Sequence, residues 1–407
     1  MDFDFSSEQR ELQAQARRYL ADHCGRSQVR AVLDGPQAFD ATLWQGLGRQ
    51  GYLGAAIPEA YGGLLDPAAP ADGLLAQCVL SEELGRAVAP VPYASSLGLA
   101  APLLLAAGTE AQKQRWLPAL ASGELIATLA WAEGAGRLDA AQVRGCRVSD
   151  GRLHGSKQPV ADGDIAHLLI VAARCAADEA AGGRAFSLWL VQAGPEVQRQ
   201  PLASLDPTRS QAHLVFNAAP AEALGAPGQG AALLDAALDR AAVPLAFEQI
   251  GGADAALEAA VAYAQQRYAF GRPIGSLQAI KHMLADMYVS ATLARSNACY
   301  GAWALASAAA ELPEAAATAR VSATQAYQHC ARNNIQAHGG MGFTWEFDCH
   351  LHYRRAQHLA LALGSARQWE DRLVDALKAR RTRERAAGTA DATAAATAAA
   401  NAAATPA

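Results

Sequence analysis

The sequence predicts an α+β protein in which a small β domain separates two helical domains. Of its 407 residues, 51% are hydrophobic and only 6% aromatic, and much of the apolar share is Ala, the best helix former. Apolar residues recur at helical spacing near both ends of the chain, whereas the middle contains short apolar runs between turn clusters. We therefore expect an N-terminal helical domain (1–121), a middle β domain (122–230) and a C-terminal helical domain (231–379).

The N-terminal domain is expected to consist of helices that Gly and Pro interrupt. Ser7 is a good N-cap, and apolar residues follow it at helical spacing through Leu20. Thr109, with Gln112 three residues later, has the pattern of a capping box at the start of another helix. These signals predict an all-helical domain up to about residue 121.

The middle domain has the pattern of short strands and turns. Four apolar runs, at 125–131, 167–172, 186–191 and 213–216, are separated by Asp-Gly, Gly-Gly and Asp-Pro turn pairs. Several short strands within roughly 100 residues are typical of a small barrel or sandwich.

The C-terminal domain returns to helical spacing. Pro244 is expected to kink or interrupt its first helix, and a Gly/Pro turn separates that helix from one over about 276–310. A third helix is expected over about 315–337 and a final one from about His350. The segment 380–407 ends in an Ala- and Thr-rich tail with almost no bulky apolar residue, and we expect it to be disordered.

Composition and cysteine usage exclude several classes of protein. Asp and Glu number 39 against 34 Lys and Arg, a formal charge of −5, which argues against nucleic acid as the main partner. The seven cysteines are scattered without a C-x-x-C pair, which indicates reduced thiols and predicts no metal site. No secretory signal is visible, and the longest apolar stretch, 97–107, is far too short to span a membrane. A cytoplasmic protein with no membrane partner is expected.

Two motifs in the C-terminal domain point to an anionic ligand. Arg267 lies at a helix end beside a tight Gly/Pro turn, and Gln278 lies just inside the next helix. The planar guanidinium of an Arg at such a place matches the oxygens of a pyrophosphate. Far downstream, Gly339 and Gly340 lack Cβ atoms, so backbone N–H groups can approach a bulky anion. Either motif alone is more often a solvated helix end or a simple turn.

Together the two motifs resemble the acyl-CoA dehydrogenase family, over nearly the whole chain. The resemblance implies a β-barrel middle domain, a C-terminal four-helix bundle, bound FAD and α,β-dehydrogenation of an acyl-CoA thioester. Electrons would then pass to an electron-transferring flavoprotein. In the family these contacts commonly reach the cofactor of a neighbouring subunit, so a tetramer is implied. The matching positions imply FAD contacts from Arg267, Phe270, Gln278, Gln336, Gly339 and Gly340.

The reaction needs a carboxylate over the α-hydrogen and hydrogen-bond donors to the thioester oxygen. Where the family most often has a catalytic Glu, this chain has Leu363, which cannot take a proton. Other family branches have the base on an earlier helix, and the matching residue here is Glu248, among apolar neighbours. Asp239 and Glu370 are weaker candidates. The alternative for Glu248 is a buried acid that pairs with an Arg.

The middle domain departs from the family pattern at its flavin contacts. The usual Thr-Glu-Pro begins here with Ala132 and lacks the Pro, and the usual Lys-x-Trp-Ile-Thr has Pro159 and Ala161 in place of Trp and Thr. A ring face and a hydroxyl donor are therefore missing, which puts in doubt whether this domain holds a flavin ring.

Three further segments resemble the heteromeric acyl-CoA dehydrogenases of bacterial steroid side-chain degradation: 204–209, 342–346 and 353–356. In that branch two different chains build each site. The resemblance implies a homo- or heterotetramer with a second acyl-CoA dehydrogenase-like chain and a bulky or steroid acyl-CoA substrate. This chain would then provide the base and the contacts to the ADP end of FAD.

Two other functions remain open for the same fold. The chain could be a non-catalytic assembly subunit that completes a partner's flavin site, or an oxygen-using acyl-CoA oxidase or flavin monooxygenase. Small residues beside Glu248 (Ala246, Gly251, Gly252 and Ala253) could make room for a bulky acyl group, but we expect them to serve close helix packing.

Overall fold

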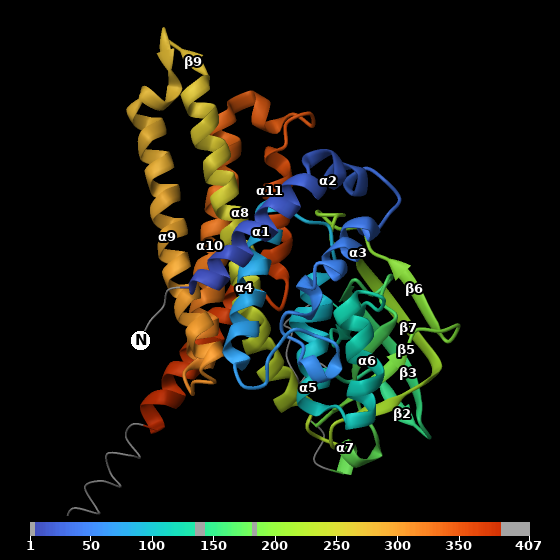
Figure 1. The fold of residues 1–407 in the computed structure, drawn as a ribbon. Helices are drawn as coiled ribbons and strands as arrows, with labels where there is room; N and C mark the ends of the chain where they lie inside the picture. Colours follow the sequence, from blue (N-terminus) through green and yellow to red (C-terminus); the bar gives the residue numbers. More distant parts are fainter. Residues whose placement is uncertain (1–4, 135–142, 181–184, 384–407) are drawn as a thin grey trace, which may run out of the picture.

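A computed structural model describes residues 5–134, 143–180 and 185–383. A bundle of long helices lies beside a part that contains two β-sheets, and the N-terminal helices cover the junction between them (Figure 1). The predicted α+β fold class is confirmed, with the β domain between two helical regions.

The N-terminal region is helical, as predicted. Ser6 is the N-cap of α1, one residue before the predicted Ser7, and it exchanges reciprocal hydrogen bonds with Gln9 in a capping box. The predicted capping box of Thr109 and Gln112 is confirmed at the start of α6. The elements are α1 (Ser7–His23), α2 (Arg26–Leu33), α3 (Ala41–Arg49), η1 (Tyr52–Gly54), η2 (Glu59–Tyr61), α4 (Pro70–Ala87), the π-helical η3 (Ala94–Ala100), α5 (Ala101–Ala107) and α6 (Glu110–Ser122).

The middle region forms two four-stranded sheets rather than one closed barrel, in the orders β1-β4-β5-β8 and β2-β3-β7-β6. The four predicted runs correspond to β1, β4, β5 and β7. The other strands went unpredicted because polar residues interrupt their apolar pattern, as in β6, where most residues are not buried. The elements are β1 (Ala127–Ala130), β2 (Arg147–Ser149), β3 (Arg152–Ala161), β4 (Leu168–Ala173), α7 (Ala176–Ala180), β5 (Ser187–Gln192), β6 (Val197–Pro201), β7 (Gln211–Pro220) and β8 (Glu222–Leu224).

The C-terminal region is a helical bundle. Pro244 lies inside α8 without interrupting it, so that part of the prediction is wrong. The helix continues because it packs against α4, α9 and α10, and this tertiary packing outweighs one lost backbone hydrogen bond. The elements are α8 (Gly230–Gln266), β9 (Tyr268–Ala269), β10 (Arg272–Pro273), η5 (Ile274–Ser276), α9 (Gln278–Ala306), α10 (Leu312–His338), η6 (Gly339–Phe343) and α11 (Cys349–Leu361).

A last helical segment covers 366–383. Residues 380–383 of the segment expected to be disordered therefore belong to this helix, and 384–407 lie outside the described residues. No helix in the described part of the chain has the length and apolarity needed to cross a membrane. All seven cysteines are free thiols.

Glycines allow α8 to pack closely against α4. A Cβ on Gly85 would lie 1.8 Å from the carbonyl oxygen of Glu248, and one on Gly251 would lie 1.9 Å from the carbonyl oxygen of Glu82. Neither Gly251 nor its small neighbours lines the cavity described below. The small residues therefore serve helix packing, as expected, and this close contact sets the position of Glu248.

Candidate active site

A cavity of about 380 Å³ lies where the N-terminal helices, the middle domain and the C-terminal bundle meet. Its walls come from η3, β1, β3, the loop before β7, α8, and the end of α11 with the turn that follows. Most of its lining is apolar. The polar side chains in it include Asp162, Arg209, Glu248 and His358.

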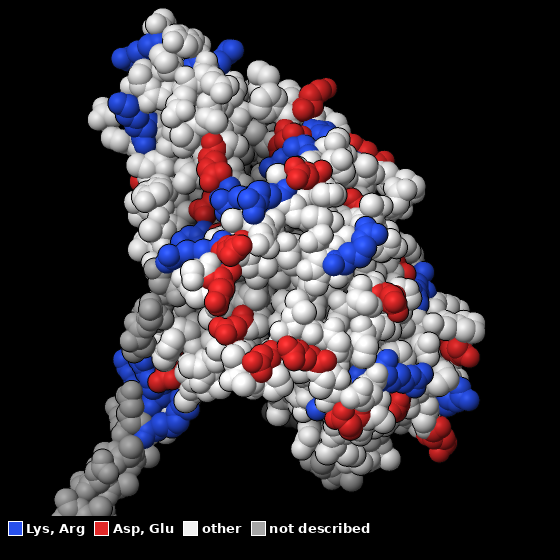
Figure 2. Space-filling model, viewed as in Figure 1, with Lys and Arg blue, Asp and Glu red and all other residues white. Residues whose placement is uncertain are grey.

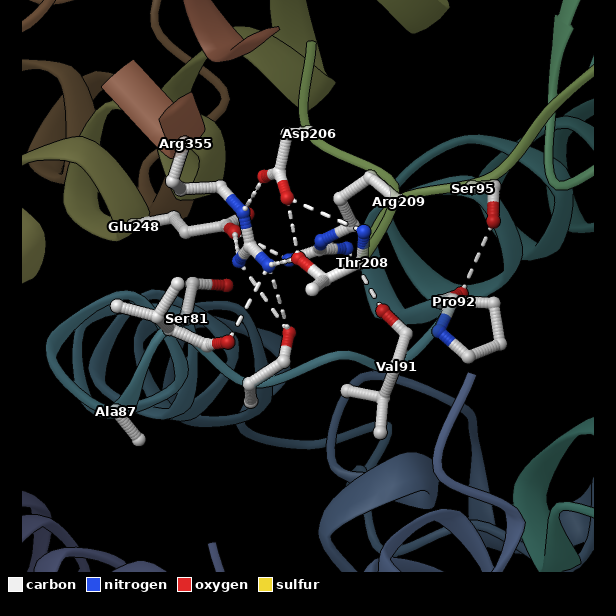
Figure 3. Close-up of polar contacts among 12 residues, drawn as sticks. Ser81, Ala87, Val91, Pro92, Ser95, Asp206, Thr208, Arg209, Glu248 and Arg355 are labelled. Atoms are coloured by element: carbon white, nitrogen blue, oxygen red, sulfur yellow. Dashed lines mark hydrogen bonds and ion pairs between the residues drawn. The ribbon is translucent and has the colours of Figure 1, made fainter. Parts of the chain in front are cut away.

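Glu248 is buried on α8 at the wall of this cavity, with 4% of its surface exposed. Its Oε1 accepts hydrogen bonds from Nη2 of Arg209 and from Nη1 of Arg355, the latter at 3.4 Å (Figure 3). Within the described residues no hydrogen bond reaches its Oε2. One carboxylate oxygen is thus anchored, and no donor in the described part of the chain competes for the other.

Arg355 joins Glu248 to a second acid. Its Nε donates to Oδ2 of Asp206 at 2.7 Å, and its Nη2 donates to Oγ1 of Thr208 at 2.9 Å (Figure 3). Burial alone would raise the pKa of Asp206, but the charge of Arg355 and the hydroxyl of Thr208 outweigh it and lower that pKa. The two segments around Asp206 and Arg355, which the sequence linked only by resemblance, therefore meet at Glu248.

Arg209 is the second cation at Glu248, and it also lines the cavity. Its Nη1 donates to the carbonyl oxygen of Val91 at 2.7 Å. Burial lowers the pKa of Arg209, because the attraction of Glu248 does not offset the loss of hydration. The guanidinium is therefore held rigidly between a backbone carbonyl and the candidate base.

Two polar groups of the cavity were missed from the sequence. His358 lies on α11, and its pKa is lowered to about 4. Burial is the largest cause. The negative charge of Asp206 opposes this shift, whereas the positive charges of Arg355 and Arg209 act in the same direction as burial. Its imidazole is therefore neutral near pH 7, and no hydrogen bond to its ring is found in the described part of the chain. In the sequence, the only indication of its role was its position three residues before Leu361, where the expected active-site turn begins.

Asp162 is the other missed group. Its carboxylate accepts hydrogen bonds from Ser95 at 2.6 Å and from Ser210 at 3.3 Å. Burial raises its pKa despite these donors. In the sequence Asp162 belongs to an Asp-Gly turn pair, which gave no signal of a buried group.

Among the three acids predicted as bases, Glu248 alone lines the cavity. Asp239 accepts from Arg372 at 2.7 Å, and Glu370 is exposed. Leu363, at the usual family position of the base, does line the cavity and gives it an apolar wall.

Three middle-domain positions that carry flavin contacts in the family pattern are apolar here. Ala132, Pro159 and Ala161 all line the cavity, so the positions of the expected flavin contacts face it without a ring or a hydroxyl. The neighbouring Glu133 accepts from the buried Lys157 at 2.6 Å and from backbone amides, which is a structural role. These three positions therefore give a flavin ring an apolar surface and no polar side chain.

The six residues predicted to contact FAD lie outside the cavity and are all exposed. Tyr263 near the end of α8 stacks on His338 at the end of α10, with ring centroids 4.1 Å apart. Arg267 follows one turn after Tyr263, and Gly339 directly follows His338. The two motifs are therefore at the same end of the bundle (Figure 1).

This end of the bundle fits an anionic group presented from outside the chain. Gly339 has φ +60°, and no atom lies within 4 Å of the position where a Cβ would be on it or on Gly340. Phe270 is 92% exposed, and basic side chains gather at this end on the face in view (Figure 2). An exposed Arg at the same end of the bundle as an open glycine pair suits the diphosphate of a dinucleotide. Gln278 and Gln336 are the other two residues predicted to contact FAD, and both are exposed.

Comparison with known proteins identifies the family. One family model, the N-terminal domain of acyl-CoA dehydrogenases, matches residues 6–124, and another, the C-terminal domain, matches residues 228–377. Acyl-CoA dehydrogenase IpdE2 of Mycobacterium tuberculosis is 35% identical over 354 residues, which cover 86% of this chain and 91% of that protein.

Two solved structures are similar along nearly the whole chain. A variant of the Tcur3481-Tcur3483 steroid ACAD has a TM-score of 0.80 and 32% identity, covering 92% of this chain and 99% of its own. The ChsE4-ChsE5 complex from Mycobacterium tuberculosis has a TM-score of 0.81 and 28% identity, covering 93% and 99%. The resemblance to a steroid enzyme and to a two-chain complex is confirmed. The chain therefore belongs to the acyl-CoA dehydrogenase family and is an FAD-dependent acyl-CoA dehydrogenase.

Proposed function

We propose that this chain catalyses the α,β-dehydrogenation of a bulky or steroid acyl-CoA as one chain of a heteromeric enzyme. An electron-transferring flavoprotein would accept the electrons. The observation that carries the proposal is the buried Glu248 carboxylate at the wall of the cavity, with one oxygen anchored and the other without a donor among the described residues. Family membership supports the reaction class, and the similar steroid ACAD and two-chain complex support the substrate class and the assembly.

Glu248 is the general base in this proposal. Arg209 and Arg355 hold its Oε1, and its Oε2 takes the proton from the α-carbon of the thioester. Bound FAD supplies the acceptor for the hydride that leaves the β-carbon. Loss of the proton and the hydride leaves the trans-2-enoyl thioester. The guanidinium groups contribute by fixing the carboxylate before the substrate arrives, so its orientation costs little at the reacting step.

The cofactor site is shared between chains in this proposal. Ala132, Pro159 and Ala161 provide no polar partner for a flavin ring, whereas Arg267 and the pair Gly339 and Gly340 are open to a group held by another chain. A homo- or heterotetramer with a second acyl-CoA dehydrogenase-like chain satisfies both observations. The test is the flavin-to-chain ratio of this chain purified alone and with the products of adjacent genes. Stoichiometric FAD and acyl-CoA turnover in the chain alone would contradict the shared site.

The role of Glu248 is tested by Glu248→Gln in the assembled enzyme. We expect turnover to fall by about 10²–10⁴-fold with FAD content unchanged, because the amide cannot take the α-proton. Glu82→Gln is the matched control, since Glu82 is 2% exposed, pairs with Arg295 at 2.9 Å and lies outside the cavity lining. Its turnover should stay within a few fold of the wild type.

A non-catalytic assembly subunit is the second candidate, and the pairing of Glu248 with two arginines favours it, since buried acids often serve structure in this way. Unchanged turnover in Glu248→Gln would support that role and refute the base. Peroxide release in place of reduction of an electron-transferring flavoprotein would instead assign the chain to the oxygen-using enzymes.

A further inference from the structure

The proposed reaction places a negative charge on the thioester oxygen. When the α-proton leaves for Glu248, the electron pair of the broken C–H bond moves toward that oxygen. Hydrogen-bond donors that are in place before the reaction stabilise such a charge. The cavity should therefore contain a side chain that has an unused donor and lies near Glu248.

Most polar side chains of the cavity use their donors within the protein. Those that donate to a protein oxygen, besides Arg209, are Gln77, Ser81, Tyr93, Ser95, Thr128 and Ser210. Among the described contacts, the donor-bearing side chains of the lining that donate no hydrogen bond are those of Trp131, Ser204, Gln211, Gln357 and His358. A donor for the thioester oxygen is therefore to be sought in this smaller group.

His358 is linked to the surroundings of Glu248 in two ways. It lies on α11 three residues after Arg355, so the two side chains share one face of the helix, and Arg355 contacts Glu248. The charges of Asp206, Arg355 and Arg209 also act on its imidazole. These are the same charged groups that surround the candidate base.

The other four side chains lack these links. Gln357 is two residues after Arg355 and so lies on a different face of α11, where its Oε1 accepts a hydrogen bond from Gln328 at 3.0 Å. For Trp131, Ser204 and Gln211, the described contacts include none to Glu248 or to the two arginines that hold it.

The imidazole of His358 is able to bind a ligand in the cavity. It lines the wall, and neither of its nitrogens is hydrogen-bonded or fully buried in the described part of the chain. Because its pKa is about 4, the ring is neutral near pH 7, and one nitrogen carries a hydrogen that it can donate. A neutral ring also forms no ion pair with Glu248, whose Oε2 stays open to the α-proton.

We propose that His358 donates a hydrogen bond to the thioester oxygen of the substrate and stabilises the enolate that forms there. The inference rests on the proposed function, because it needs the α-carbon to lie at Glu248. The α C–H bond breaks, its proton passes to Oε2 of Glu248, and its electron pair moves to the thioester oxygen that His358 contacts. When the hydride leaves the β-carbon for FAD, that electron pair returns to form the α,β double bond.

Two measurements on the assembled enzyme test this contact without relying on turnover. The probe is tert-butylacetyl-CoA at saturating concentration, which has α-hydrogens but no β-hydrogen and so cannot lose a hydride. The first measurement is the ¹³C chemical shift of its labelled carbonyl carbon, which moves downfield when the oxygen accepts a hydrogen bond. The second is the rate at which its α-hydrogens exchange with deuterium from the solvent.

We expect His358→Leu to slow the exchange by about 10²-fold and to return the carbonyl shift toward that of the free thioester. His358→Gln keeps an N–H donor and should restore part of both. His213→Leu is the matched control, because His213 is a partly buried histidine on β7 outside the cavity lining, and it should leave both values unchanged. Since the His358 ring has no partner in the described fold, His358→Leu should unfold at the wild-type temperature near pH 7.

The outcomes separate this proposal from the proposed function. An unchanged carbonyl shift in His358→Leu, or an exchange rate within about threefold of the wild type, overturns the role of His358, while loss of exchange in Glu248→Gln keeps the base. A lost shift and slow exchange in His358→Leu, with normal exchange in Glu248→Gln, supports the contact and refutes the proposed base. A changed flavin spectrum with an unchanged carbonyl shift in His358→Leu would assign the imidazole to the cofactor and overturn the proposal.

Discussion

Replacing Arg355 with methionine removes the cation that joins two buried acids behind the cavity. The Arg355 side chain is 0% exposed and contacts Asp206 at 2.7 Å and Glu248 at 3.4 Å. Asp206 is 3% exposed, so in the variant its carboxylate stays buried without a cation. Loss of one partner from a buried ion pair costs about 3–5 kcal/mol. We expect Arg355→Met to lower the free energy of unfolding by that amount.

Urea unfolding, followed by tryptophan fluorescence and circular dichroism, measures this loss. The double variant Arg355→Met/Asp206→Asn removes both charges and should be less destabilised than Arg355→Met alone, with a coupling of about 0.5–3 kcal/mol. Lys378→Met is the control, because Lys378 and Asp375 form an exposed pair, at 72% and 75%, which contributes about 0–1 kcal/mol.

A loss below about 1 kcal/mol in Arg355→Met would refute this reasoning, since the value belongs to surface pairs. The reasoning would also be refuted if Asp206→Asn simply added its own destabilisation. Both results would mean that water reaches the acids in solution and that Arg355 does not anchor Glu248 firmly.

Three further predictions follow from the described contacts. The free energy of unfolding should decrease as the pH falls from about 6.5 to 4. The pKa of His358 is about 4 in the folded protein and 6.5 ordinarily, so the unfolded chain takes up the proton first. In His358→Gln, the free energy of unfolding should depend less on pH over this range. Gly85→Ala should destabilise the protein by about 1–3 kcal/mol and lower its turnover, because the new Cβ would lie 1.8 Å from the carbonyl oxygen of Glu248 and α8 would have to shift. A melting temperature equal to that of the wild type would contradict the close packing of α8 on α4. Arg267→Ala should lower the FAD content of the assembled enzyme, measured by its visible spectrum, while the exposed Arg272→Ala on the same turn leaves it unchanged; equal flavin loss in both would remove the specific role of Arg267.

The candidate site was only partly accessible from the sequence. Glu248 was found because the usual base position holds Leu363, and the segments containing Asp206 and Arg355 were found by resemblance. Neither finding predicted that Arg355 contacts both Asp206 and Glu248. His358 was indicated only by its place just before the expected active-site turn, because a single polar residue in a helix is indistinguishable in sequence from one that faces solvent.

The sequence by itself determined the order of a helical region, a β region and a second helical region, since the period of apolar residues records which face of each element is buried. It also identified Arg267 and Gly339 as parts of two motifs that point to an anionic ligand. The tertiary structure alone decided that Glu248 meets Arg209 and Arg355, which lie 39 and 107 residues away along the chain. The physical reason is that periodicity specifies that a face is buried but not what packs against it, and charges in the interior take their properties from those neighbours.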